Sequence, residues 1–223
     1  MSDHEHHAAT VNGTVVSRDR VNALLEAVPA RDHEARPEAF ARAERQRRRW
    51  ATQVVVVDEL ARQACARRGL SGPGLNPGTA PPRGATSHDG AAPDEQRTVT
   101  ASPAELGSIV AVALAHSPAA RTLLEQLERE QLIPEEALYD YYDRNRDRFL
   151  TPEALSRGAD PFSETSDLLP YDQVREGIAG ELRRAAGHRA FFDWLDQARA
   201  DVVYAPGHEH PGDPSHPDHE HRH

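Results

Sequence analysis

One stretch in the middle of the chain limits what the chain can fold into, because it offers almost nothing to bury. It reads SGPGLNPGTAPPRGATSHDGAAPDEQR, from Ser71 to Arg97. Glycine and proline interrupt helices and strands, and small polar residues supply little apolar surface. The glycines lack a lysine and a G-x-G-x-x-G spacing, so the segment does not indicate a phosphate-binding loop. The sequence therefore predicts a disordered linker at about 71–98 between two structured segments.

The composition is typical of a soluble, acidic protein. The chain has 223 residues, of which 28% are charged and 38% hydrophobic, and its formal net charge is −10. No apolar run approaches the roughly 18 residues that a membrane helix needs. The chain begins Met-Ser-Asp-His-Glu, without the basic and apolar segments of a secretory signal. We therefore expect a cytoplasmic protein with no membrane association.

The basic residues are all arginine. The 26 basic residues include no lysine, which excludes a Walker-A lysine, a Schiff-base lysine and a Ser-Lys dyad. Arg45, Arg47, Arg48 and Arg49 form a cluster, but acidic neighbours and the acidic total favour a solvated helix face with i,i+4 ion pairs. We expect no nucleic-acid partner. The single cysteine, Cys65, excludes an intramolecular disulfide and a C-x-x-C pair.

Start and stop signals predict two helices before the linker. Asn12-Gly13 lies between β-branched residues and predicts a tight turn between short strands. Ser17 is a helix cap, followed by apolar residues at helical spacing up to Pro29. A long helix is predicted from Pro37 to a stop at Gly69.

After the linker the pattern is helical again. A helix is predicted to start at Ser102-Pro103, to break at 116–118 and to resume from 121 to 130. Further helices are predicted from Ile133-Pro134 through Phe149 and from Tyr171 to about Arg199, separated by an irregular segment. The β-prone run at 201–204 is predicted to pair with the strand near 11–16. The fold class is therefore mostly α, with a small β pairing of N- and C-terminal strands.

Three segments together resemble one family. They are VNGTVVSRDRVNALL at 11–25, IPEEALYDYYDRNRDRF at 133–149 and YDQVREGIAGELRRAAGHRAFFDWLDQARADVVY at 171–204. In this order they are similar to the N-terminal chaperone domain of the SurA-like, parvulin-associated peptidyl-prolyl isomerases. The resemblance implies a SurA N-terminal-like helical domain over 9–204, which cradles an unfolded or partly folded protein client.

The chain departs from that family where the catalytic domain belongs. In the family a complete parvulin domain stands between the second and third segments. Here the interval is TPEALSRGADPFSETSDLLP, residues 151–170, which is too short for a four-stranded domain and contains no histidine or cysteine. We therefore expect no isomerase activity. What the resemblance leaves is the helical part that holds a client.

A client would be held by apolar side chains, and the aromatic residues of the second half are the candidates. The alternative for each of them is a place in the domain's own core. The predicted client-binding residues are Tyr139, Tyr142, Phe149, Phe191, Phe192 and Trp194.

Histidines gather at both ends of the chain, in an N-terminal tip at 1–8 and a proline-punctuated tail at 205–223. Neutral imidazoles suit Ni, Zn and Cu(II), and mixed spacings on an extended segment predict weak, poorly selective binding. A pH-responsive solubilising tail is the alternative, and a purification tag is disfavoured because the tail is varied and acidic. No cofactor is required. The predicted metal ligands are His4, His6, His7, His208, His210, His216, His219, His221 and His223.

The sequence leaves three hypotheses. The first is a non-catalytic SurA-like chaperone or assembly factor that holds a protein client. The second is a metallochaperone or metal-storage accessory for a metalloenzyme, with the histidines as the metal carriers. The third is an unrecognised acyl-transfer or other enzyme, although neither a G-x-S-x-G nor an H-E-x-x-H motif is present.

Overall fold

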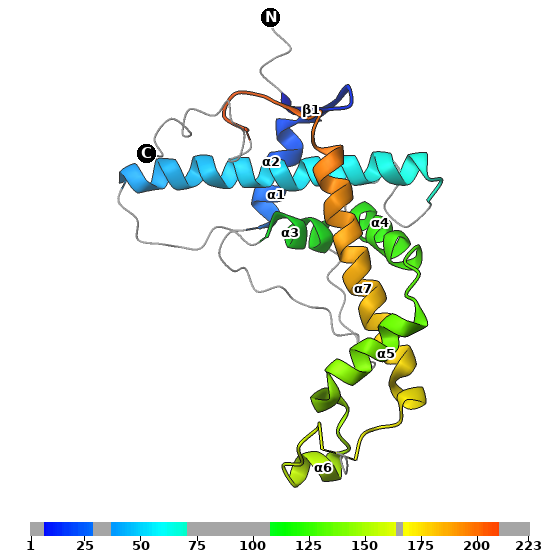
Figure 1. Ribbon diagram of the computed structural model, residues 1–223. Coiled ribbons are helices and arrows are strands. Elements are labelled where there is room, and N and C mark those ends of the chain that lie inside the picture. The colour runs from blue at the N-terminus through cyan, green and yellow to red at the C-terminus, as the bar shows by residue number, and fades with distance from the viewer. Residues whose placement is uncertain (1–6, 29–36, 71–107, 164–166, 210–223) are drawn as a thin grey trace, which may run out of the picture. The chain divides into compact units, whose positions relative to one another are not determined.

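The computed structural model describes residues 7–28, 37–70, 108–163 and 167–209. Within these ranges 68% of the residues are helical, in seven α-helices, and three short strands form one antiparallel sheet (Figure 1). The sheet contains an N-terminal and a C-terminal strand. The predicted fold class, mostly α with a small pairing of the terminal strands, is confirmed. The linker predicted at 71–98 lies outside the described residues.

The chain divides into two compact units. The terminal unit comprises residues 1–123 and 196–223, and the middle unit comprises residues 124–195. The residues predicted as one helical domain, 9–204, are thus shared between the two units. No described helix is long and apolar enough to cross a membrane.

The sheet of the terminal unit starts from a hairpin. Asn12 and Gly13 both have positive φ, 49° and 81°, as Asn-Gly pairs have in two-residue hairpin turns. They join β1 (His7–Val11) to β2 (Thr14–Ser17), as predicted. The strand β3 (Val203–Tyr204) pairs with β1 on the other side, so that the order is β2-β1-β3.

The position of the last strand corrects the prediction. It was expected near 11–16, but β3 lies opposite Ala9 and Thr10. The two residues of β3 pair with the middle of β1, on the edge that β2 leaves free. The hydroxyl of Tyr204 donates to Gln53 Oε1 at 3.0 Å and fastens β3 to the long helix below.

The long helix α2 (Pro37–Arg67) is the element on which the other parts of the terminal unit pack. Every residue from Trp50 to Val57 is buried, so this part of α2 is covered on all sides. The sheet, α1 (Arg18–Ala27) and α3 (Ile109–His116) contact it (Figure 1). The core around it is built mainly from small apolar side chains: Ala8, Ala9, Val11, Val16, Val21, Ala51, Val54, Val55, Val56, Val57, Leu60, Ala61, Ala64, Val110, Ala113, Ala119, Ala120 and Leu123.

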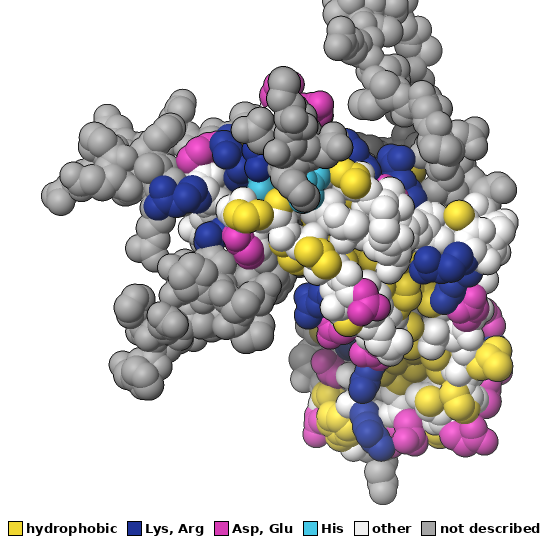
Figure 2. Space-filling view, turned by 90° about the horizontal axis from the view of Figure 1, so that it is seen from above, with side chains coloured by type: hydrophobic (Ala, Val, Ile, Leu, Met, Phe, Trp, Pro, Cys, Tyr) yellow, Lys and Arg dark blue, Asp and Glu magenta, His cyan; other side chains and the backbone are white. Residues whose placement is uncertain are grey.

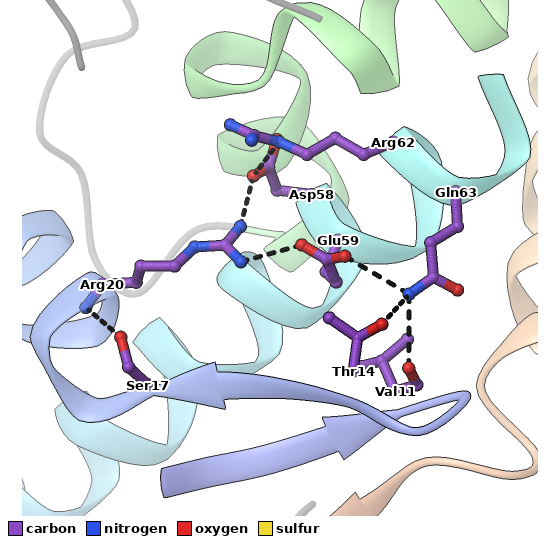
Figure 3. Close-up of polar contacts among 8 residues, drawn as sticks. All are labelled: Val11, Thr14, Ser17, Arg20, Asp58, Glu59, Arg62 and Gln63. Carbon is purple, nitrogen blue, oxygen red and sulfur yellow. Dashed lines mark hydrogen bonds and ion pairs between the residues drawn. The ribbon is translucent and has the colours of Figure 1, made fainter. Parts of the chain in front are cut away.

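Polar side chains hold α1 and the hairpin against α2 (Figure 3). Arg20 donates to Asp58 and to Glu59, at 2.8 Å each. Gln63 donates to the backbone oxygen of Val11 at 3.2 Å. The predicted cap is confirmed, because the hydroxyl of Ser17 accepts from the backbone nitrogen of Arg20 at 3.4 Å.

The arginine cluster of α2 is used within the chain. Arg47 donates to the backbone oxygens of Leu25 and Val28, at 2.6 Å each, and so caps the end of α1. Arg48 lies 3.8 Å from Glu44 in an i,i+4 pair. The predicted ion pairs on this face are therefore present, and one arginine has the further role of ending a neighbouring helix.

The predicted helix break at 116–118 is confirmed. Helix α3 ends at His116 and α4 (Pro118–Arg129) begins two residues later. The hydroxyl of Ser117 accepts from the backbone nitrogen of Ala120 at 3.0 Å, as a capping residue does. The predicted helix start at 102–103 lies outside the described residues.

The middle unit contains α5 (Glu135–Arg144), the 3₁₀ turn η2 (Arg146–Phe149), α6 (Pro152–Ser156) and most of α7 (Tyr171–Ala198). The helix predicted through Phe149 is shorter, because the side chain of Asn145 donates to the backbone oxygen of Tyr141 at 2.7 Å and ends it. The segment expected to be irregular contains α6 and a bridge between Leu150 and Leu168. A buried cluster of Leu138, Phe149, Ile178 and Ala179 joins these elements.

Candidate client-binding surface

The six predicted aromatic residues all lie in the middle unit, at different depths. Phe149 and Phe191 are buried, with 9% and 1% of their surface exposed. Tyr142 and Trp194 are half-buried. Tyr139 and Phe192 are exposed, by 58% and 46%. Only the last two therefore offer a largely exposed side chain, about half of its surface or more, to a partner without a change in the core.

The exposed ring of Tyr139 belongs to a cluster of tyrosines. Its centroid lies 5.2 Å from that of Tyr171 and 6.4 Å from that of Tyr142. The rings of Tyr142 and Tyr171 are 5.5 Å apart, edge to face. Tyr142 continues inward to Phe149 at 5.1 Å. A chain of tilted ring contacts thus leads from the surface to the core of the unit.

Sequence reasoning missed Tyr171. It stands 32 residues after Tyr139 and was noted only as the start of the last helix. Its one signal is its place after Pro170 at the first turn of α7. Such a position fixes the backbone but does not show which other helix the ring meets.

Hydrogen bonds hold the tyrosine rings in place. The hydroxyl of Tyr142 donates to the backbone oxygen of Leu169 at 2.7 Å, and that of Tyr171 donates to Glu135 at 2.7 Å. Arg175 also donates to Glu135, at 2.9 Å from Nε. Glu135 lies on the same face of α5 as Tyr139, four residues later, and its carboxylate connects that face to α7.

The ionisation of this cluster follows from its contacts. The hydrogen bonds from Arg175 and then Tyr171 lower the pKa of Glu135. Burial, and then the hydrogen bond to Glu135, raises the pKa of Tyr171. Burial raises the pKa of Tyr142. Around neutral pH the carboxylate is therefore charged and both phenols are neutral, which suits apolar contact rather than proton transfer.

Further apolar side chains are exposed on the middle unit. Leu132 is 93% exposed, Leu155 66% and Phe162 61%, and none of the three was a predicted site residue. With Tyr139 and Phe192 they make five of the seven large hydrophobic side chains that are exposed within the described ranges. Figure 2 shows hydrophobic side chains (yellow) at the surface among acidic (magenta) and arginine (dark blue) ones. We call these five residues the apolar set.

Of the nine predicted metal ligands, the described ranges include His7 and His208. His7 begins β1 and is half-buried, and its backbone oxygen accepts from Arg18 Nε at 3.3 Å. His208 follows β3 by four residues and is 3% exposed. The other predicted ligands lie outside the described residues: His4, His6, His210, His216, His219, His221 and His223.

The ring of His208 is buried in the terminal unit and is held there by a hydrogen bond. Its Nδ1 lies 2.7 Å from the hydroxyl of Thr52. That hydroxyl donates its own hydrogen to the backbone oxygen of Arg48 at 2.9 Å, so Nδ1–H of His208 is the donor in the contact with Thr52. Burial, followed by the charges of Arg18 and Arg48, lowers the pKa of His208. The native ring is therefore neutral around pH 7.

The described part of the chain contains no cluster of three His, Cys, Asp or Glu side chains that suits a metal ion. Its one described cysteine, Cys65, is buried on α2, and burial raises its pKa. Its thiol donates to the backbone oxygen of Ala119 at 3.4 Å. This thiol is inert packing rather than a nucleophile.

Comparisons of the chain with protein-family models, with curated proteins and with solved structures gave no match. The resemblance to SurA-like chaperone domains therefore depends on the three sequence segments alone.

Proposed function

We propose that this protein is a cytoplasmic, non-catalytic, SurA-like chaperone or assembly factor, whose middle unit holds an unfolded or partly folded protein client. The observation that carries the proposal is the concentration of exposed apolar side chains in that unit. A soluble protein commonly exposes single apolar residues. Seven large hydrophobic side chains are exposed within the described ranges, and five of them, the apolar set, belong to the middle unit. The other two, Val15 and Val203, belong to the terminal unit.

The expected affinity is that of a protein that holds and releases its client. Burying one large apolar side chain contributes about 1.5–3 kcal/mol. Association costs roughly 4–15 kcal/mol in lost freedom, with more for ordering an unfolded client. A client that covers most of the apolar set therefore binds weakly and reversibly.

The interval 151–170 supports a non-catalytic role. In the family that the sequence resembles, an isomerase domain stands here. In this chain the interval contains the short helix α6, and the flanking Leu150 and Leu168 form an antiparallel bridge. The backbone nitrogen of Thr151 donates to the oxygen of Asp167 at 2.9 Å, so the loop is closed at its base.

Suppression of aggregation tests the proposal. A denatured model enzyme is diluted into buffer with the full chain, and light scattering is followed over time. Wild-type protein is expected to lower the scattering at a small molar excess. The triple variant Tyr139→Ser, Phe162→Ser, Phe192→Ser is expected to need several-fold more protein for the same effect, because the client loses three apolar contacts.

The matched control changes the exposed apolar residues of the other unit. Val15→Thr with Val203→Thr keeps the shape of two side chains that are 61% and 66% exposed and removes their apolar character. This double variant is expected to suppress aggregation like wild type. Equal loss in both variants, or no suppression by wild-type protein, contradicts the proposal.

A second candidate is a metallochaperone or metal-storage accessory, and one observation favours it. The pairing of β1 with β3 places Ala9 opposite Tyr204. His7 and His208 therefore stand where the two histidine-bearing ends leave the same sheet. Nine of the thirteen histidines belong to these two ends, and neutral imidazoles there would hold Ni, Zn or Cu.

Calorimetric titration with Ni, Zn and Cu(II) tests this candidate. Wild-type protein is expected to bind with micromolar-class affinity, because the mixed histidine spacings of the sequence predict several alternative, poorly selective ligand sets. A variant with Ser at His210, His216, His219, His221 and His223 is expected to lose most of the heat. The control is a variant with His116→Ser and His188→Ser, two histidines that are far in sequence from both ends of the chain. Unchanged binding in the tail variant shows that the tail histidines are not the metal carriers, and no binding by wild-type protein rules out the second candidate.

A further inference from the structure

Two arginines of the middle unit lie against aromatic rings of the same unit. The guanidinium of Arg148 lies 5.6 Å from the ring centroid of Tyr141, donates to the Tyr141 hydroxyl and donates to Glu181 at 2.8 and 3.1 Å. The guanidinium of Arg146 lies 6.0 Å from the ring of Phe162 and is paired with Asp143. In both places a guanidinium lies next to an aromatic ring and is paired with a carboxylate of the same unit.

Tyr139 also has carboxylates near its ring, but no arginine of the described residues lies over the ring. Tyr139 is 58% exposed. Glu136 precedes it by three residues on α5 and therefore lies on the same helix face. The carboxylate of Glu136 is exposed, and no side chain in the described ranges pairs with it.

A second carboxylate stands beside the partner ring. Asp172 follows Tyr171 in the first turn of α7, and its charge is close enough to raise the pKa of the Tyr171 phenol. The carboxylate of Glu135 already accepts from Arg175 and from the Tyr171 hydroxyl. The open carboxylates at the tyrosine cluster are thus Glu136 and Asp172.

The middle unit as a whole is acidic, which favours a basic partner. Residues 124–195 contain 16 Asp and Glu against 9 Arg and no lysine. A basic segment is therefore attracted to this unit, and an acidic one is repelled.

We infer that Tyr139, with Glu136 and Asp172, takes an arginine side chain of the client, so that the preferred clients are extended, apolar segments that carry arginine. The planar guanidinium stacks on the ring and donates to both carboxylates, whereas a lysine ammonium is more strongly hydrated and cannot stack. The inference deepens the proposed client-holding function and rests on it.

Matched peptides test the inference by fluorescence anisotropy with the full chain. Three labelled peptides share one extended apolar sequence and differ at a central residue, which is arginine, lysine or citrulline. Citrulline keeps the shape of arginine without its charge. The arginine peptide is expected to bind about three- to tenfold more tightly than the citrulline peptide, with lysine in between.

Variants locate the preference. Tyr139→Leu keeps an apolar side chain but removes the ring face, and it is expected to bring the arginine and lysine peptides to equal affinity. Glu136→Gln is expected to lower the arginine preference. Glu153→Gln removes an exposed carboxylate from α6 in the same unit and is the control for general acidic attraction. Circular dichroism checks that each variant keeps its helical content.

Each result bears on one of the two claims. Equal binding of the arginine and citrulline peptides overturns the inference while the client-holding function stands. An arginine preference that survives Tyr139→Leu, or that falls equally in Glu136→Gln and Glu153→Gln, also overturns it. Absence of binding by all three peptides, together with absence of aggregation suppression, overturns the proposed function itself.

Discussion

The two units use their apolar residues in opposite ways. In the terminal unit the buried side chains are mostly alanine and valine, packed closely around α2, and Val15 and Val203 are its exposed large hydrophobics. In the middle unit large side chains such as Phe191 and Leu138 fill the core, and five others stay exposed. The terminal unit thus exposes few large apolar side chains, whereas the middle unit leaves several of them exposed in addition to those in its core.

The exposed valines of the terminal unit follow from strand register. Val15 and Val203 both lie opposite Thr10, on the two neighbouring strands. Alternation along a strand sends these three side chains to the same face of the sheet, while Ala9 and Val11 point to the buried face. Their exposure is thus a consequence of the pleat. The exposure of Leu132, Tyr139 and Phe192 has no such cause.

The largest expected effect separates two neighbouring residues of α7. Phe191→Ala removes a ring that is 1% exposed and contacts Trp194 in a tilted arrangement, with 5.2 Å between the ring centroids. It is expected to cost about 3–5 kcal/mol in the free energy of unfolding. Phe192→Ala, at a ring that is 46% exposed, is expected to cost less than about 1 kcal/mol. Urea denaturation measures both, and similar costs at the two positions contradict the assignment of Phe192 to the surface.

The next effect concerns how closely the helices of the middle unit approach. A Cβ at Gly187 would lie 2.8 Å from the Cα of Glu128, so Gly187→Ala forces α7 away from α4. It is expected to destabilise by about 1–3 kcal/mol. Gly177→Ala meets nothing within 4 Å and is expected to gain up to about 1 kcal/mol through helix propensity. Thermal unfolding compares the two, and a stable Gly187→Ala variant contradicts the close crossing.

Local signals in the sequence predicted the ends of elements well. Asn12-Gly13, Ser17 and Ser117 each act through their own backbone or through a hydrogen bond to a residue three positions away. Chemistry of this range is visible in a short window of sequence. The early end of α5 was missed, although it depends on a similar local bond from Asn145, because an asparagine within a helical pattern has several possible partners.

The candidate site was predicted only in outline. The aromatic residues were identified, but helical spacing did not separate the buried Phe149 from the exposed Tyr139, since their depth depends on where α7 packs. His208 was grouped with the tail histidines by composition. Its buried place follows from the turn at Gly207, with φ of 86°, and from Thr52, which lies 156 residues away in sequence. No local pattern records a contact of that range.

The ion pairs of the two units also differ, in how far they are exposed. Arg20 of the terminal unit is 33% exposed and faces two carboxylates that are 17% and 12% exposed. Arg20→Met is expected to cost roughly 1–2 kcal/mol, between the values for surface and buried ion pairs, because Asp58 and Glu59 lose their shared cation. In the middle unit Arg144 and Asp140 are 76% and 66% exposed. Arg144→Met is expected to leave stability unchanged in chemical denaturation, and an equal loss at both sites contradicts the contrast.

The smallest expected effect concerns the histidines of the two units. His208 of the terminal unit is buried and its pKa is lowered by burial and by Arg18 and Arg48. In the unfolded chain the same ring takes up a proton near pH 6.5. The unfolded state therefore binds more protons below that pH, so the stability that His208 contributes is complete above pH 6.5. It is lost as the pH falls from there toward the lowered native pKa.

The substitution His208→Asn separates this contribution from that of other groups. The asparagine amide can donate to the Thr52 hydroxyl in place of Nδ1–H and does not titrate, so stability at pH 7.5 is expected to change by about 1 kcal/mol or less. Between pH 7.5 and pH 5.5 the variant is expected to lose less free energy of unfolding than wild type. The same change at His188 of the middle unit, whose side chain is 50% exposed, is the control. If wild type and His208→Asn lose equal stability over this range, the buried ring does not distinguish the terminal unit from the middle unit in its response to acid.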